Sequence, residues 1–340
     1  MKHSIVAVIL ALSLAFSTAA FAKDIDSIDL FSGDYIGIVG ADFDNLTSRP
    51  LYKKVMGDAS VNKEADGLKS KLSALDASLD AEKDIDTMLV AIPKDVDKSE
   101  HVIIFEFKKS LANAVAAIES DSVKPDSAYS RMEADGIVYY VHKRENEWIT
   151  VLGDKRIAVG SEREVKAVAA SNKAGKAAKP IKNNAALYKQ YQAADKKSDI
   201  WGAYVLTSRE LNELKDVVLD GENGKSFHAD QIEGGTTSIH LANGLALGIV
   251  AKMKSESAAA DGSAVLGSTL GAFLSDPSLN DMGLGFLASA IKISSSKSDL
   301  KANINFTNAQ VDVLIGLAAE AGGAAIQQSA PATSKKKIAN

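Results

Sequence analysis

Residues Thr236–Met253 read TTSIHLANGLALGIVAKM, and this stretch decides the fold class. Asn243-Gly244 separates two runs that are rich in β-branched and aliphatic residues. Asn-Gly between two such runs is a strong hairpin signal, because both central residues of a type I′ turn need positive φ. The sequence therefore predicts an antiparallel pair of strands at Thr236–Leu241 and Leu245–Met253.

Further turn signals divide the rest of the chain in the same way. Asp135-Gly136 separates two β-rich runs, and Gly153-Asp154-Lys155 joins expected strands at 147–152 and 156–160. Other strands are expected at 35–40, 87–92, 101–107, 200–206, 291–295 and 300–306, and helices at 51–56, 68–75, 257–274 and 284–290 and around Leu111, Val115 and Ile118. Strands that come mostly as hairpins predict largely antiparallel sheets with helices packed on one face, which is the α+β class.

The same order of elements occurs twice. Each half begins with a strand and a helix, continues with a hairpin and a helix, and closes with a hairpin that leads into a capped helix. Capping boxes are expected where a hydroxyl residue precedes Glu or Gln by three, at Ser161/Glu164, Thr207/Glu210 and Thr307/Gln310. We predict an internal duplication with units at residues 34–171 and 199–322. The alternative is one continuous α+β domain.

Two segments lie outside these units. Residues 172–198 contain few large apolar residues at their start, which predicts a linker followed by a short helix through Leu187 and Tyr191. Residues 329–340 contain Pro331 and the lysine run Lys335–Lys337, which predicts a disordered tail.

The N-terminus has the three parts of a secretory signal peptide. Lys2 and His3 form a basic start, Ile5–Phe16 is an apolar run, and Ala20-Phe21-Ala22 offers small residues for cleavage. We expect residues 1–22 to be removed and the mature chain to be periplasmic or secreted. No other stretch is apolar enough to cross a bilayer, so no transmembrane segment is expected in the mature chain.

Composition excludes several classes of site. The chain has no cysteine, which removes disulfides, thiolate catalysis and cysteine-ligated metals. The net charge of −5 is mild, and lysines and acids alternate without a basic face, so nucleic acid is not an expected partner.

Asp42-Phe43-Asp44 follows the first expected strand and resembles the first motif of the haloacid-dehalogenase-like phosphatases. The resemblance implies that Asp42 attacks phosphorus, that Asp44 acts as acid and base, and that magnesium bridges them. The sequence departs from that family at Asn45-Leu46-Thr47, and Ala158 stands where a later acidic residue is expected. The hairpins also disagree with that family's parallel sheet. An Asp helix cap is the competing interpretation.

Other polar groups give no reactive centre. Asp80, Glu82, Asp84 and Asp86 alternate like calcium ligands but lack the glycine and final acid of an EF-hand loop, so a solvated loop is expected. The same is expected of Asp24, Asp26 and Asp29. Two strand histidines and a carboxylate would make a zinc site, but His101, His142, His228 and His240 are not spaced as ligand pairs. Trp148, Trp201, Tyr139, Tyr140 and Tyr204 are expected in strands, as core residues or as an exposed face for a peptide or glycan.

The signal peptide, the Asp-Ile-Asp run before Met88–Ile92, the stretch Gly153–Gly160 and the repeated order make the chain similar to exported bacterial proteins of the domain-of-unknown-function type with duplicated α+β units. Such families carry no assigned activity. We therefore expect a non-enzymatic binding or scaffolding protein of the bacterial cell envelope, with no catalytic, cofactor or metal site and an unknown protein or small ligand as partner. The alternatives are a phosphatase-like envelope hydrolase using Asp42 and Asp44, and a carrier of a small apolar ligand between the two units.

Overall fold

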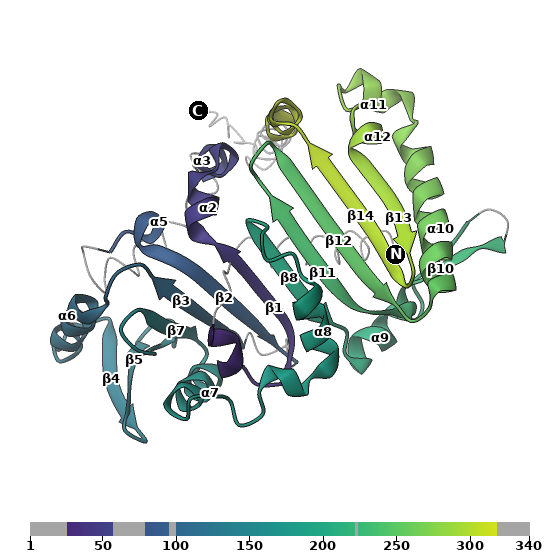
Figure 1. Cartoon of the computed structure of the whole chain (residues 1–340). Helices are drawn as coiled ribbons and strands as arrows, with labels where there is room; N and C mark the ends of the chain where they lie inside the picture. Colours follow the sequence, from purple (N-terminus) through teal and green to yellow (C-terminus); the bar gives the residue numbers. More distant parts are fainter. Residues whose placement is uncertain (1–25, 57–78, 95–99, 222–223, 318–340) are drawn as a thin grey trace, which may run out of the picture.

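The computed structural model describes residues 26–56, 79–94, 100–221 and 224–317 (Figure 1). The first half contains η1 (Asp26–Leu30), β1 (Tyr35–Asp42), α2 (Phe43–Ser48), α3 (Pro50–Met56), α5 (Ala81–Asp84), β2 (Ile85–Pro93), β3 (Val102–Phe107), α6 (Ala112–Ser122), β4 (Tyr129–Ala134), β5 (Ile137–His142), β6 (Trp148–Val151), β7 (Arg156–Gly160) and α7 (Glu162–Lys173). A connection follows, with η3 (Ile181–Asn183) and α8 (Ala185–Ala193). The second half contains β8 (Ile200–Val205), α9 (Ser208–Leu214), β9 (Val218–Asp220), β10 (Ser226–His228), η5 (Ala229–Gln231), β11 (Ile232–His240), β12 (Leu245–Met253), α10 (Glu256–Leu274), α11 (Pro277–Asp281), α12 (Leu287–Ala290), β13 (Ile291–Ser296) and β14 (Asp299–Phe306).

Twelve of the described strands form one continuous antiparallel sheet. Their order across the sheet is β13-β14-β12-β11-β8-β1-β2-β3-β7-β6-β5-β4. The remaining described strands, β9 and β10, form a separate small hairpin. The α+β class and the largely antiparallel sheet predicted from the turn signals are confirmed.

The two halves join edge to edge through β1 and β8, where Ile38 pairs with Ala203 and Val39 with Gly202. Read outward from this junction, the two halves repeat one pattern. In each half, three strands pair in chain order (β1-β2-β3 and β8-β11-β12), and a helix follows them (α6 or α10). A later hairpin then places its second strand (β7 or β14) beside the third of these strands. The first half adds β5 and β4 beyond this pattern. The topology is repeated within one shared sheet, while the duplication itself stays a prediction.

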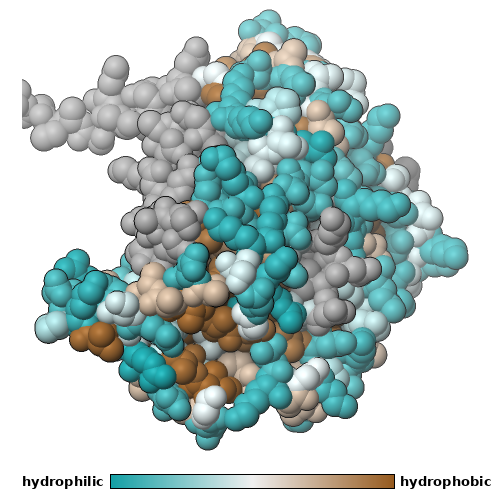
Figure 2. Space-filling model, turned by 60° about the vertical axis from the view of Figure 1, so that its left-hand side comes forward, coloured by the Kyte–Doolittle hydropathy of each residue, from teal (hydrophilic) through white to brown (hydrophobic). Residues whose placement is uncertain are grey.

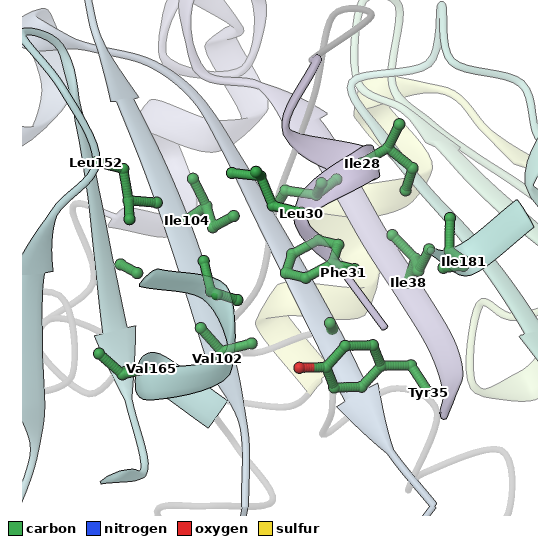
Figure 3. Packing of buried hydrophobic residues seen from close by; sticks show 14 of the residues in the cluster. Ile28, Leu30, Phe31, Tyr35, Ile38, Val102, Ile104, Leu152, Val165 and Ile181 are labelled. Atoms are coloured by element: carbon green, nitrogen blue, oxygen red, sulfur yellow. The ribbon is translucent and has the colours of Figure 1, made fainter. Parts of the chain in front are cut away.

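Alternation along the strands divides the first half into two cores. Val39 and Ala41 of β1 belong to a cluster with α2 and α6, which includes Phe107 and Ile118. Ile38 points to the opposite face, into a cluster with η1, α7, η3 and α8. Figure 3 labels ten members of that second cluster: Ile28, Leu30, Phe31, Tyr35, Ile38, Val102, Ile104, Leu152, Val165 and Ile181. Helices therefore cover both faces of the sheet in the first half, not one face. Successive strand residues point to opposite faces, and where both are apolar each face has to be buried by a helix.

The second half has its own smaller core. Ala259 and Val265 of α10 pack with Phe227 of β10 and Leu300 of β14. α10 lies along the outer strands β13 and β14 and contacts the small hairpin through β10 (Figure 1).

The predicted linker is packed against the first half. Ile181 and Leu187 are fully buried, although the segment before them is polar. Backbone hydrogen bonds hold this segment to the start of the described chain, from the amide of Gly33 to the carbonyl of Lys179 at 2.7 Å and from Ile181 to Phe31 at 3.0 Å. Buried side chains and backbone hydrogen bonds together anchor a segment that composition alone marks as a linker.

The structure refines the predicted turns and helices. Asp135 and Gly136 have φ values of 54° and 68°, which confirms the hairpin between β4 and β5. The helix predicted at 284–290 is too long, because only Leu287–Ala290 is helical there. A separate helix, α11, lies before it in the chain and has Asp276 as its N-cap. Residues 308–317 are helical, as predicted after Thr307.

Three predicted segments lie outside the described residues: the signal peptide at 1–22, the helix at 68–75 and the tail at 329–340. Within the described ranges, no helix combines the length and the apolar character needed to cross a membrane.

Candidate binding groove

A surface groove lies beside α7, and β7 sets the position of this helix. β7 ends at Gly160, which has φ 153° and lies so close to β3 that a Cβ there would be 2.2 Å from the carbonyl oxygen of His101. Only glycine permits this approach. α7 then buries Val165, Val168 and Ala169 against the sheet.

A buried polar cluster fixes the first turn of α7. The Tyr35 hydroxyl donates a hydrogen bond to Oε2 of Glu164, and in Figure 3 this hydroxyl points toward the side where Val165 of α7 lies. Arg163 bridges Glu164 and Glu100 at 2.6 and 2.5 Å. Burial, followed by the negative charge of Glu164, raises the pKa of Tyr35 far above that of a free phenol. The tyrosine is therefore a neutral hydrogen-bond donor to a buried carboxylate.

This cluster corrects the predicted capping box at Ser161/Glu164. Ser161 is the N-cap residue but makes no side-chain cap hydrogen bond. Glu164 is 6% exposed and its carboxylate is taken by Tyr35 and Arg163. The Thr207/Glu210 box is confirmed, and the reciprocal bonds between Thr307 and Gln310 are also present, at 2.8 and 3.3 Å.

The groove runs between α7 and the β4–β5 hairpin and has a volume of about 570 Å³. Its apolar lining comes from Ala134, Ile137 and Tyr139 of the hairpin and from Ala167, Ala170 and Ala174 on one side of α7. Small side chains on the helix leave this space open. Figure 2 brings the first half forward and shows hydrophobic residues reaching the surface low on that face among hydrophilic ones. The volume is within the range of small-molecule sites.

Cationic side chains line the helix side of the groove. Arg163, Lys166 and Lys173 project from α7, and Asp135 is the acidic residue of the lining. Lys166 lies 2.6 Å from Glu162 and its ammonium is 4.6 Å from the centre of the Trp148 ring. A cation over an indole face is held by the ring quadrupole. The apolar floor thus has a border of cationic side chains, of which Arg163 and Lys166 are paired with carboxylates.

Trp148 packs against Tyr139, which is one of the lining residues of the groove. The two rings meet edge to face, with centroids 5.6 Å apart. Burial raises the pKa of Tyr139, while the nearby Lys166 opposes this shift. Both Trp148 and Trp201 are buried, so the interpretation of the strand aromatics as core residues is confirmed for the tryptophans.

The acids considered for a hydrolase lie elsewhere and have structural partners. Asp42 caps α2, accepting from the backbone amide of Asn45 at 3.1 Å and from its side-chain amide at 2.7 Å. Asp44 pairs with Lys108. The capping interpretation of Asp42 is confirmed, and the antiparallel sheet differs from the parallel sheet that the phosphatase resemblance implies.

The second acidic stretch forms a helix start instead of a loop. Asp80 caps α5 and pairs with Lys83, while Asp84 accepts from the backbone amide of Asp80 and pairs with Lys109 at 2.7 Å. Within the described ranges, no three His, Asp or Glu side chains gather around a possible metal position.

The four histidines in the described part of the chain are dispersed. His142 accepts from the backbone amide of Glu145, and His240 lies 3.1 Å from Asp195. His101 precedes β3, and His228 ends β10. The structure does not bring these side chains together.

Sequence reasoning missed the groove. The signal was present in the spacing of Arg163, Lys166, Ala167, Ala170 and Lys173, which places cations beside alanines on one helix face. The groove also depends on the position of the β4–β5 hairpin beside α7, which follows from the order of the strands in the sheet.

Comparison with known proteins gives a distant likeness. No family model and no curated protein matches the sequence. A solved structure, crystal form I of TP0453, is similar at a TM-score of 0.41 and 9% identity, over 87% of this chain and 98% of that chain.

Proposed function

We propose that the chain is an exported, non-enzymatic binding protein of the bacterial cell envelope, and that the groove beside α7 holds its ligand. The predicted signal peptide supports export to the periplasm or beyond. The engagement of Asp42 as a helix cap supports a binding role over the phosphatase-like alternative.

One observation carries the binding proposal. Ala167, Ala170 and Ala174 are exposed on the side of α7 that faces Ile137 and Tyr139 across the groove. The solvent side of a surface helix normally carries polar residues. An apolar wall opposite an apolar floor is the lining typical of a ligand site.

The position of the groove differs from the ligand position expected for a carrier of a small apolar ligand, which was between the two units. At the junction of the halves, however, β1 and β8 are paired along their length, from Gly37–Tyr204 to Ala41–Ile200. The groove lies wholly within the first half, so we place the ligand there.

Filling the groove tests this function. The neutral probe N-phenyl-1-naphthylamine gains fluorescence when it enters an apolar site, and we expect it to bind the mature protein. Ala170→Leu places a larger side chain in the groove, and we expect it to abolish this binding while the protein stays folded, because Ala170 is exposed.

Ala264→Leu is the matched control, since Ala264 is an exposed alanine on α10 in the second half. It should leave probe binding unchanged. Equal binding by the wild type and both variants would show that the probe sits elsewhere, and the groove would lose its proposed role.

A further inference from the structure

The charges beside the groove are unequally neutralised. Arg163 is committed to Glu100 and Glu164, and Lys166 is paired with Glu162. Lys173 differs, because its ammonium donates to the backbone carbonyl of Asp135 at 2.6 Å. A carbonyl is a neutral acceptor, so this hydrogen bond gives the lysine no ion-pair partner.

No carboxylate lies within ion-pair distance of Lys173 in the part of the chain that the structure describes. An ammonium has three donors, and the Asp135 carbonyl uses one of them. Lys173 is also exposed. It can therefore donate to a second acceptor, and an anionic oxygen is the acceptor that its charge favours.

The shape of the groove specifies the rest of the ligand. The lining residues of α7 run from Arg163 to Lys173, about 15 Å along the helix axis, and Ala174 follows as the C-cap. Lys173 stands near one end of this run, and the alanines continue from it toward the N-terminal turn. An elongated apolar body fits along the alanines and Ile137, with its polar head at Lys173.

We infer that the groove binds an amphiphilic anion, a free small molecule with an apolar chain and a carboxylate or similar anionic head. This inference rests on the proposed function, since it names the ligand class of the same groove. A cationic head would be repelled by the ammonium of Lys173, and a neutral head would leave Lys173 without an ion-pair partner.

Competition against the neutral probe tests the head group. Dodecanoate, dodecan-1-ol and dodecyltrimethylammonium share one chain length and differ in head charge, and each is used below its micelle concentration. We expect dodecanoate to displace the probe at the lowest concentration and the trimethylammonium compound at the highest. Added salt should reduce the difference between the displacing concentrations of these compounds, because salt screens exposed charges.

Lys173→Gln isolates the anchor. Glutamine keeps a donor for the Asp135 carbonyl but removes the charge, and we expect dodecanoate affinity to fall about two- to fivefold with dodecan-1-ol affinity unchanged. Lys176→Gln, an exposed lysine just beyond the groove lining, is the control and should change neither.

The outcomes separate the two proposals. If dodecan-1-ol competes as well as dodecanoate and Lys173→Gln has no effect, the anionic ligand is ruled out while the groove remains a binding site. If no compound displaces the probe and Ala170→Leu leaves probe binding unchanged, the proposed binding function is ruled out as well. Binding to phosphatidylglycerol vesicles without binding to monomeric dodecanoate would also overturn the inference, since the ligand would then be a membrane surface.

Discussion

Lys173 Nζ donates to the backbone carbonyl of Asp135 at 2.6 Å and so ties the last turn of α7 to the β4–β5 turn. The two residues are separated by three strands of the sheet in chain order, yet this bond closes one end of the groove. The turn at Asp135-Gly136 is therefore part of the site as well as part of the fold.

Changing the turn glycine should loosen the groove. Gly136 has φ 68°, and in Gly136→Ala the new Cβ has to adopt that backbone conformation 3.4 Å from the Lys173 ammonium. We expect a loss of about 1–2 kcal/mol in the free energy of unfolding. Gly267→Ala in α10 is the matched change in open helical space and should instead stabilise by about 0.5–1 kcal/mol. Urea unfolding measures both, and equal effects would contradict the account of the turn.

Asp42 should respond to substitution as a helix cap. Asp42→Asn keeps a good capping side chain, whereas Asp42→Ala removes the acceptor for the Asn45 amide and should lower stability by about 1 kcal/mol. Urea unfolding of the two variants provides the comparison. Equal stability of Asp42→Ala and Asp42→Asn would contradict the role of Asp42 as a helix cap.

The pair Arg49–Asp199 joins the first half to the start of β8. Arg49 Nε lies 2.7 Å from Asp199 Oδ1, the Asp199 side chain is 1% exposed, and its other oxygen accepts from the Leu241 amide at 2.6 Å. In Arg49→Met the carboxylate loses its charge partner, and we expect a loss of about 2–4 kcal/mol, reduced from that of a fully buried pair because Arg49 is partly exposed.

The double variant Arg49→Met/Asp199→Asn should recover part of that loss, because the buried charge is then absent. A double-mutant cycle by urea unfolding measures the coupling. Additive losses would show that the two side chains do not stabilise each other.

Alkaline pH should destabilise the protein through its buried tyrosines. Burial raises the pKa of Tyr204, Tyr140 and Tyr52 to about 12, from 10 in the unfolded chain, and Tyr35 is raised further. The folded state therefore holds these protons more tightly. The stabilisation is fully present below about pH 10 and is lost as the pH rises from about 10 to 12.

Ultraviolet absorbance of the phenolate measures this titration. Of the eight tyrosines in the sequence, we expect these four to ionise only well above pH 10 in the folded protein, and Tyr139, whose pKa burial also raises, to ionise above its usual range. All eight should ionise near pH 10 in denaturing urea. A single transition near pH 10 under both conditions would contradict the burial of these rings.

The sequence predicted the antiparallel sheet because turn signals are local. Asp135-Gly136 and Asn243-Gly244 each mark a hairpin, and the structure confirms both strand pairings. The second turn is longer than the predicted two residues, because it spans 241–244 and has positive φ only at Gly244. The Ser161/Glu164 box failed for a reason that local pattern does not contain: Tyr35, distant in the chain, takes the Glu164 carboxylate. The packing of the linker through Ile181 also depends on long-range contact with Phe31.

The groove was unpredictable for the same reason. Its floor comes from Ile137 and Tyr139, its wall from Ala167 and Ala170, and they meet only because β6 and β7 carry α7 back beside the hairpin. The acids that the sequence singled out, Asp42 and Asp44, are local features of a helix start.

Photocrosslinking locates the ligand most directly. A dodecanoate analogue with a diazirine on its terminal carbon is irradiated with the mature protein, and labelled peptides are identified by mass spectrometry. We predict labels within residues 134–139 and 163–174, lost in Ala170→Leu and retained in Ala264→Leu. Labelling concentrated on α10 or on the second half of the sheet, unchanged by Ala170→Leu, would contradict the groove beside α7 as the binding site.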